Sequence, residues 1–335
     1  MILVTGGTGL LGSHLIFDLL KTEKQVVVLK HSESSISKIK HTFSYYTDKP
    51  EEFINRIKWV DGDVLNYYSL LDAMQGVTKI YHCAALVSFL PSDKYNLHNI
   101  NVNGTANVVN AALEKNINKL LFVSSIGALG AARNENPIDE NSEMTDSTSK
   151  SDYSMSKYFA ELEVWRGINE GLKAVIVNPS VILGANNWAE NVKDFFSTIW
   201  NGLSYYTLGK TGFVDVRDVS KAIILLMNSE IKNERFILNS ENLSYKKLFN
   251  LVADGLNKKH PKFYASPFLT NIAWRYEYLK KRITGKKELI TKFTARNAHC
   301  KDEYSNKKFV DEVNYKFIPV KDTVSYIADI FLKQV

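Results

Sequence analysis

A tyrosine and a lysine four residues apart, Tyr153 and Lys157, have the types and spacing that acid–base chemistry needs. In a helix, side chains four positions apart lie on one face, so the phenol and the ammonium group can point into the same cleft. A nearby cation stabilises a phenolate and would lower the pKa of Tyr153 toward neutrality. The pair therefore predicts a site of proton transfer.

Two hydroxyl groups, Ser124 and Ser125, follow directly after the apolar run Leu120–Val123. A side chain at the carboxyl end of a parallel strand lies at the edge where open α/β sheets bind ligands. One of these two hydroxyls is therefore a candidate for contact with a substrate.

The first twelve residues predict a phosphate-binding turn. The apolar run Ile2–Val4 leads into glycines at positions 6, 9 and 12, and a helical pattern follows over Ser13–Leu20. Gly6 allows a tight turn, Gly9 lets a pyrophosphate approach the backbone, and Gly12 lets the helix pack on the sheet. The helix N-terminus would then face the anion. The alternative is an ordinary tight turn, since a glycine spacing alone is a weak signal.

Six short apolar runs, separated by amphipathic segments, predict the elements that position these groups. Such alternation favours right-handed βαβ crossovers and a doubly wound, mostly parallel sheet, the α/β Rossmann fold. The runs are continuously apolar, as expected of strands covered on both faces. They are Ile2–Val4, Gln25–Lys30, Ile57–Asp61, Lys79–Cys83, Leu120–Ser124 and Ala174–Val177.

The alternation loosens after about Leu183, where aromatic-rich segments begin. We therefore expect a Rossmann domain over residues 1–180, with 213–240 returning to it. A smaller, interleaved lobe that binds substrate is expected to occupy most of residues 181–335.

Composition excludes several classes of protein. The chain has 335 residues, a net charge of +6 and two cysteines, Cys83 and Cys300, which give neither a disulfide framework nor a metal-ligand spacing. No leader pattern and no apolar run of about 18 residues is present. We expect a cytoplasmic enzyme that binds no metal ion and has no integral membrane association.

Residues 258–287 combine many cations with aromatic side chains such as Phe268, Trp274, Tyr276 and Tyr278. This segment could be a membrane-surface helix or a nucleic-acid patch. The modest net charge favours a solvated helix face instead, and no nucleic-acid partner is expected. The aromatic side chains are expected to belong to the core or to a lid over the substrate.

With these elements in this order, the chain resembles the extended short-chain dehydrogenase/reductases, the superfamily of NAD-dependent epimerases and dehydratases. Within it, residues 177–184 and the position of Lys30 are similar to the dihydroflavonol reductase-like and 3β-hydroxysteroid dehydrogenase-like branch. The resemblance extends over nearly the whole chain, and its further motifs are Asp61–Val64, His82–Ala85, Asn101–Thr105, Val177–Ser180 and Phe213–Val219.

The resemblance implies roles for three catalytic residues. Tyr153 would donate or accept the proton, and Lys157 would lower its pKa and hold the nicotinamide ribose. Ser125 would polarise the substrate carbonyl, with Ser124 as the alternative in a register shifted by one residue.

The same resemblance implies the cofactor contacts. Asp63 and Val64 would lie at the adenine, Ala84 and Ala85 along the pyrophosphate and ribose, and Pro179 and Ser180 beside the nicotinamide. Asn101 would open the helix under the cofactor, although a plain N-cap explains an Asn there equally well. The remaining implied contacts are Gly6, Thr8, Gly9, Leu10, Leu11, Gly12, Val123, Tyr153 and Lys157.

Lys30 and His31 stand at the end of the second predicted strand, where an NAD site usually places an acidic residue for the ribose hydroxyls. A cation attracts the 2′-phosphate of NADP, and a carboxylate would repel it. We therefore expect NADP(H) as the cofactor. The alternative is that Lys30 points to solvent and NAD serves as well.

Residues 184–213 are rich in aromatic side chains and contain the cations Lys193 and Lys210 but no arginine. A nucleotide-sugar site needs donors for a pyrophosphate, so this stretch and Ser88–Leu90 favour an apolar or aromatic pocket. The alternative is that the aromatic side chains form the core of the smaller lobe. They are Trp188, Phe195, Phe196, Trp200, Tyr205, Tyr206 and Phe213.

The resemblance then implies NADPH-dependent reduction of a ketone or aldehyde, or the reverse oxidation. Two alternatives stay open: a nucleotide-sugar epimerase or dehydratase with tightly bound NAD, and a non-catalytic NAD(P)-binding sensor. Family likeness supports a class of reaction and does not name a substrate.

The predicted helices near Asn101 and Tyr153 carry apolar residues on more than one face. One face must cover the sheet, and the other needs its own partner. In similar reductases these helices pair across a two-fold axis, which implies a homodimer. The alternative is a monomer whose extra apolar face is covered by the C-terminal lobe.

Overall fold

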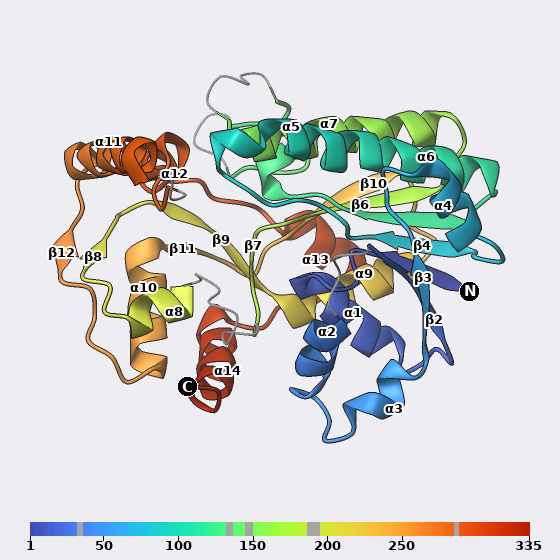
Figure 1. Cartoon of the computed structure of the whole chain (residues 1–335), viewed down its shortest axis with the longest axis horizontal. Coiled ribbons are helices and arrows are strands. Elements are labelled where there is room, and N and C mark those ends of the chain that lie inside the picture. Colours follow the sequence, from blue (N-terminus) through green and yellow to red (C-terminus); the bar gives the residue numbers. More distant parts are fainter. Residues whose placement is uncertain (32–35, 132–136, 145–149, 186–194, 285–287) are drawn as a thin grey trace.

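The computed structural model describes residues 1–31, 36–131, 137–144, 150–185, 195–284 and 288–335. Two lobes lie side by side (Figure 1). The larger lobe is built on a seven-stranded sheet in the order β10-β6-β5-β4-β1-β2-β3. All of its strand pairings are parallel, so the predicted doubly wound Rossmann fold is confirmed.

The six predicted strands are all present in this sheet, within one or two residues of their expected bounds. The seventh, at the edge beside β6, was not predicted, because its first residues, Glu234 and Arg235, are charged and leave only three apolar positions. The strands are β1 (Ile2–Thr5), β2 (Val26–Lys30), β3 (Ile57–Asp61), β4 (Lys79–His82), β5 (Lys119–Val123), β6 (Ala174–Pro179) and β10 (Glu234–Leu238).

Helices cover both faces of the sheet, and a separate apolar core fills each side (Figure 1). One face is covered by α1 (Leu10–Leu19), α2 (Ile36–Phe43), α3 (Pro50–Ile54), α9 (Val216–Asn228) and α13 (Lys307–Val313). The other is covered by α4 (Tyr67–Ala73), α5 (Lys94–Leu97), α6 (Gly104–Glu114) and α7 (Asp152–Asn169).

Helix α1 begins at Leu10, not at Ser13 as predicted, so Gly12 lies inside its first turn. A Cβ atom at Gly12 would stand 2.2 Å from the carbonyl oxygen of Gly6. Glycine is therefore needed at this position for the helix to start close to the end of β1.

The smaller lobe contains a three-stranded sheet in the order β11-β9-β7 and a two-stranded pair, β12-β8. Its strands are β7 (Val181–Leu183), β8 (Tyr205–Tyr206), β9 (Lys210–Asp215), β11 (Glu241–Ser244) and β12 (Phe263–Tyr264). Its helices are α8 (Phe195–Trp200), α10 (Tyr245–Gly255), α11 (Pro267–Thr284), α12 (Lys292–Asn297) and α14 (Val320–Leu332).

Most of the aromatic side chains predicted to line a pocket form the core of this lobe instead. Phe196 and Phe213 are buried, and Phe195 and Trp200 pack against the same cluster. Apolar burial between α8, α10 and α14 accounts for them, because these helices bury their apolar sides in one shared cluster. Trp188 and Lys193 lie outside the described residues.

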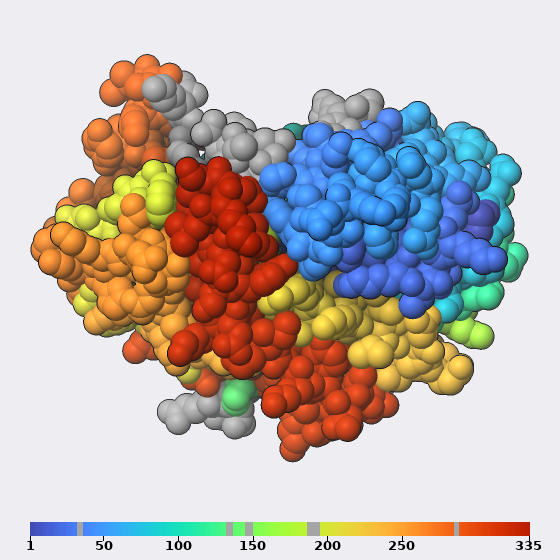
Figure 2. All heavy atoms as spheres, turned by 90° about the horizontal axis from the view of Figure 1, so that it is seen from below, coloured from blue at the N-terminus to red at the C-terminus, as the bar shows by residue number. Residues whose placement is uncertain are grey.

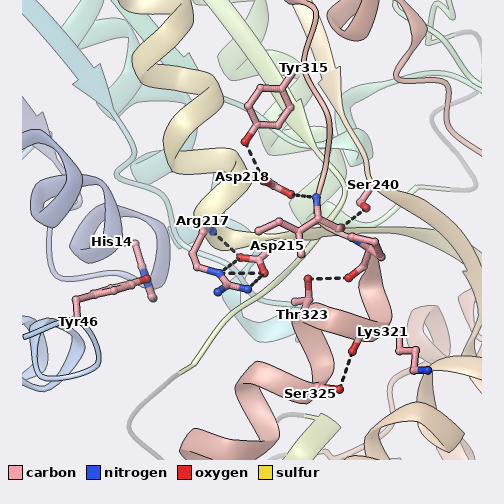
Figure 3. A network of polar contacts seen from close by, with 12 residues as sticks. His14, Tyr46, Asp215, Arg217, Asp218, Ser240, Tyr315, Lys321, Thr323 and Ser325 are labelled. Carbon is pink, nitrogen blue, oxygen red and sulfur yellow. Dashed lines mark hydrogen bonds and ion pairs between the residues drawn. The ribbon is translucent and has the colours of Figure 1, made fainter.

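The segment 215–218 joins the lobes (Figure 3). Asp215 caps α9 by accepting a hydrogen bond of 2.7 Å from the backbone nitrogen of Arg217, whose guanidinium group returns to the same carboxylate at 2.6 Å. The buried Asp218 carboxylate accepts hydrogen bonds from the Tyr315 hydroxyl at 2.8 Å and the Ile318 nitrogen at 2.7 Å. These contacts fix the chain just before α14 against the start of α9.

The aromatic side chains of helix α11 do not belong to the core, one of the two places expected for them. Phe268, Tyr276 and Tyr278 are exposed, and Glu277 is the only buried residue of the helix. Lys286 and Lys287 lie outside the described residues. None of the helices in the described part of the chain is both long enough and apolar enough to cross a bilayer.

Candidate active site

The carboxyl ends of β1 and β4 form the switch point of the sheet. These two strands are neighbours, but the chain leaves them toward opposite ends of the strand order. Open α/β sheets bind ligands in the crevice at such a point. The glycine turn after β1 and the segment Cys83–Leu86 after β4 therefore border the candidate site.

The glycine turn has the geometry of a phosphate cradle. Gly6 has φ +70°, and a Cβ atom there would lie 2.5 Å from the backbone nitrogen of Ala84. Gly9 is exposed, and only the Gly6 carbonyl oxygen lies near its missing Cβ, at 3.3 Å. Gly9 is also the N-cap of α1, and no side chain among the described residues caps the N–H groups there. The turn, which includes Thr8, Leu10 and Leu11, fits a pyrophosphate.

The other predicted cofactor residues lie along the carboxyl edge of the sheet. Asp63 and Val64 follow β3, Ala84 and Ala85 follow β4, Val123 ends β5 and Pro179 ends β6. Ser180 is buried, and its hydroxyl donates a hydrogen bond of 3.3 Å to the Leu238 carbonyl. Its side chain is therefore used within the fold.

Lys30 and His31 have acidic neighbours that the sequence analysis did not consider. The Lys30 ammonium group lies 3.0 Å from Asp61, whose side chain is 83% exposed, and the His31 ring lies 3.4 Å from Asp63. Lys30 and Asp61 are register partners on β2 and β3. The cation at this position is thus paired with a carboxylate that remains in contact with water.

Tyr153 and Lys157 both lie in the first two turns of α7. Ser151 caps this helix by accepting a hydrogen bond from the Ser154 nitrogen at 2.9 Å. The cap fixes the start of the helix, and the spacing of four residues then turns both side chains toward the end of β5. The Ser125 hydroxyl lies close enough to the phenol of Tyr153 to lower the pKa of that phenol.

The pKa of Tyr153 differs from the sequence-based expectation. Burial raises it above its ordinary value, and the hydrogen bond to Ser125 opposes that shift without reversing it. The Lys157 ammonium group donates a hydrogen bond of 2.7 Å to the Val123 carbonyl and lies over the Phe122 ring. Tyr153 is therefore a neutral phenol near pH 7, the form that can donate a proton.

Lys157 is almost fully buried, and burial lowers its pKa to about 8. The carboxylate of Glu161, one turn further along α7, acts in the opposite direction and favours the charged ammonium group. Glu161 is itself buried and faces the Arg235 guanidinium group at 3.6 Å. Glu161 was not predicted as a site residue, although its spacing of four residues from Lys157 places it on the same face of the helix.

The two serines have different surroundings. Ser124 is buried, and its hydroxyl donates a hydrogen bond of 3.2 Å to Glu161. Ser125 is partly exposed and faces Tyr153, and its carbonyl accepts a hydrogen bond of 3.0 Å from the side chain of Asn178. Asn178, a further residue missed from sequence, thereby holds the Ser125 backbone in place.

Asn101 neither opens nor caps a helix, contrary to both expectations. It lies within a π-helical turn, residues 98–103, that continues α5 into α6. Its amide accepts a bond from the Leu86 nitrogen at 2.7 Å and donates to the Leu86 carbonyl at 2.9 Å and the Ser156 hydroxyl at 2.9 Å. The side chain therefore ties the segment after β4 to α7, as is typical of π-turns near functional sites.

A stacked pair of aromatic rings lies next to Tyr153, and one of the two rings contacts it. Phe89, from the segment after β4, meets the Tyr153 ring edge-on with centroids 5.7 Å apart. Phe293, from α12 of the smaller lobe, stacks on Phe89 at 5.6 Å with the ring planes only 13° apart. Phe89 is 42% exposed, so this aromatic pair forms an accessible apolar wall next to the phenol.

The chain is 31% identical over 251 residues to a putative dihydroflavonol 4-reductase of Synechocystis sp., covering 72% of this chain and 68% of that protein. It is 25% identical over 269 residues to sterol demethylase protein B of Methylococcus capsulatus, covering 80% and 78%.

Solved structures share the fold over the whole chain. The crystal structure of gox2253 superposes with a TM-score of 0.81 at 26% identity, covering 99% of this chain and 98% of that one. UDP-glucose 4-epimerase of Thermotoga maritima superposes with a TM-score of 0.76 at 17% identity, covering 99% and 98%. The model of the NAD dependent epimerase/dehydratase family matches residues 2–238. The chain belongs to this family and is an NAD(P)-dependent oxidoreductase of the extended short-chain dehydrogenase/reductase type.

Proposed function

We propose that the protein reduces a ketone or aldehyde carbonyl on an apolar or aromatic substrate, with NADPH as the preferred cofactor. The observation that carries this proposal is a neutral Tyr153 phenol that lies beside the Ser125 hydroxyl and next to the stacked Phe89–Phe293 pair. A phenol that holds its proton is suited to protonating the oxygen of a carbonyl that is being reduced.

Each residue has a distinct part in the proposed reaction. Ser125 donates a hydrogen bond to the carbonyl oxygen, and Tyr153 delivers the proton to that oxygen. The Phe89–Phe293 pair stacks on the substrate and excludes water from one side of it. Lys157 stays protonated near neutral pH and would hold the ribose of the nicotinamide nucleotide, which supplies the hydride when it is bound.

The preference for NADPH is supported by the cations at the end of β2. Lys30 and His31 stand where the 2′-phosphate of NADP would be expected in this fold. The partner of Lys30, Asp61, is exposed, so its carboxylate can turn into water when a phosphate competes for the ammonium group. A phosphate carries more charge than a carboxylate and forms stronger charge-assisted hydrogen bonds.

The nucleotide-sugar alternative requires cations for a second pyrophosphate. Of the two lysines in residues 184–213, the one within the described residues is Lys210, and its ammonium group pairs with Glu303 at 2.5 Å. That side chain is therefore engaged in joining β9 to the segment after α12. This observation favours the reductase over the epimerase or dehydratase.

The test is a panel of aromatic aldehydes, flavanonols, keto-steroids and nucleotide sugars, with NADPH oxidation followed for each. Tyr153→Phe should lower turnover by about 10² to 10⁴-fold while cofactor binding and folding persist, because only the transferable proton is lost. Tyr158→Phe is the matched control, since Tyr158 lies on the same helix and contacts Phe159 instead of the site.

Near-normal turnover in Tyr153→Phe would overturn the catalytic assignment. Activity with nucleotide sugars alone, together with NAD that stays bound through purification, would support the epimerase or dehydratase. Cofactor binding without turnover of any carbonyl compound would support a sensor.

A further inference from the structure

Helix α11 has an exposed apolar stripe that nothing in the described chain covers. With 100° per residue, six of its exposed apolar side chains fall within an arc of about 100° along one side of the helix, and the exposed Tyr278 lies outside this arc. The six are Phe268 at 75% exposure, Leu269 at 39%, Ile272 at 49%, Tyr276 at 62%, Leu279 at 58% and Ile283 at 85%. We call these six residues the α11 stripe; it is about 22 Å long.

The opposite side of α11 makes the contacts that hold the helix on the protein. The Thr270 hydroxyl bonds to the His299 ring at 2.9 Å, and Lys281 pairs with Glu288 at 3.1 Å. Glu277 is buried and accepts a hydrogen bond of 3.0 Å from the Leu289 nitrogen. The helix is thus anchored by its polar side and presents its apolar side to solvent, the reverse of an ordinary surface helix. Figure 2 shows α11, in orange, projecting from the smaller lobe.

Cations border the α11 stripe on both sides. On the helical wheel, Arg275 and Arg282 lie next to one edge and Lys280 next to the other. The two arginines stack over neighbouring rings, Trp274 and Tyr278, and neither pairs with a carboxylate among the residues that the structure describes. Glu277, the helix's one acidic residue, is buried and pairs with Lys280 at 3.2 Å, so the net positive charge of the exposed side comes mainly from the two arginines.

We propose that α11 is an interfacial helix that docks the protein on the surface of a membrane rich in anionic lipids. An apolar stripe with cations at both borders is the arrangement that lies in the headgroup region, with apolar side chains among the acyl chains and cations at the phosphates. A second copy of the chain would bring the same cations against each other. A nucleic acid would match the cations and leave the apolar centre unpaired.

Docking there would place the membrane near the candidate site. Helix α11 packs against α12, the helix that carries Phe293 of the aromatic wall. This consequence rests on the proposed function, because it matters only if the substrate is apolar and enters from the lipid. The docking itself does not depend on catalysis.

The test is sedimentation of the full-length protein with vesicles of phosphatidylcholine and phosphatidylglycerol, compared with vesicles of phosphatidylcholine alone. We expect binding to the anionic vesicles, weakened by added salt. The double variant Arg275→Gln/Arg282→Gln should bind about 25-fold more weakly, at about fivefold per cation. The triple variant Ile272→Ser/Leu279→Ser/Ile283→Ser should lose binding by more than tenfold.

Two controls separate this proposal from others. Tyr68→Ser and Leu225→Ser remove apolar side chains of 77% and 45% exposure from other helices and should leave vesicle binding unchanged. Reduction of a water-soluble carbonyl compound should be unchanged in the α11 variants, so docking and the proposed function can fail separately.

The proposal is overturned if the wild type sediments with neither kind of vesicle, or if the triple variant still binds as the wild type does. A stable dimer that the triple variant converts to a monomer would show that a second copy covers the stripe. RNA binding lost in the arginine variant, without vesicle binding, would assign the surface to nucleic acid.

Discussion

At the scale of single residues, the ion pair between Lys30 and Asp61 should set the choice between NADPH and NADH. Lys30→Asp should weaken NADPH binding by about tenfold or more, which corresponds to about 1.4 kcal/mol, and should spare NADH. Asp61→Asn should act in the opposite direction, because it removes the carboxylate that competes with the 2′-phosphate for Lys30. Cofactor titration by fluorescence measures both.

The two variants form a matched pair, because they alter the two ends of one 3.0 Å contact. An unchanged ratio of NADPH to NADH affinity in both would place Lys30 away from the cofactor.

Glu161 should set the pKa of Lys157 without contacting the substrate. Its carboxylate raises the pKa of Lys157, which burial lowers to about 8. The charged form of Lys157 is lost as the pH rises through this value, so kcat/KM should fall above about pH 8. Glu161→Gln should move that alkaline limb to lower pH, because the opposing charge is gone and the lysine loses its proton earlier.

The measurement is the pH profile of kcat/KM, with Glu170→Gln, at the exposed C-cap of the same helix, as the control. A purely structural role for Glu161 would lower activity at all pH values without moving the limb, and that result would contradict the prediction.

At the scale of elements, the short helix α12 should control substrate preference by placing Phe293. A capping box formed by Thr291 and Thr294 fixes the start of this helix and therefore the direction of the Phe293 ring. Phe293→Ala should raise KM for aromatic substrates by about tenfold with a smaller change in kcat, because it removes the stacking surface and leaves Tyr153 in place.

Lys292→Ala, at the exposed neighbouring position, is the control for changes to α12 as a whole. Equal KM values for aromatic and small aliphatic aldehydes in wild type and Phe293→Ala would show that the aromatic wall does not contact substrate.

At the scale of the whole molecule, the outer sides of α6 and α7 should together form the interface of a homodimer. Phe159 and Leu162 lie three residues apart on α7 and are 40% and 44% exposed, while α6 and α7 pack together. Paired across a two-fold axis, these side chains would be covered by their copies.

Light scattering at micromolar concentration should therefore give twice the chain mass of 38.0 kDa. Phe159→Ser/Leu162→Ser should return the mass to that of one chain, whereas the α11 triple variant should leave the dimer intact. A single-chain mass for the wild type would show that the dimer prediction is wrong.

Much of the fold was predictable from sequence because its signals are local. Runs such as Ile2–Val4 are apolar at every position, as burial on both faces requires, and the glycine turn marks the start of α1. Tyr153 and Lys157 were recognisable because the helical repeat relates residues four apart, whatever surrounds them. The edge strand Glu234–Leu238 was missed because charged residues open it.

The tertiary structure decided what depends on burial and on distant contacts. Phe293 is far from Phe89 in the sequence, and only the packing of α12 against the larger lobe stacks the two rings. The pKa of Tyr153 is raised because the folded chain removes water from the phenol.

The sequence likewise could not predict which side of α11 is exposed to solvent. The same aromatic and basic pattern in residues 267–284 fits a helix that buries its apolar side and one that presents it to solvent. The contacts of Thr270, Glu277 and Lys281 with neighbouring segments fix which side faces inward. A residue's type and period are properties of the chain, whereas the dielectric environment and the neighbours of its side chain arise only when the elements pack together.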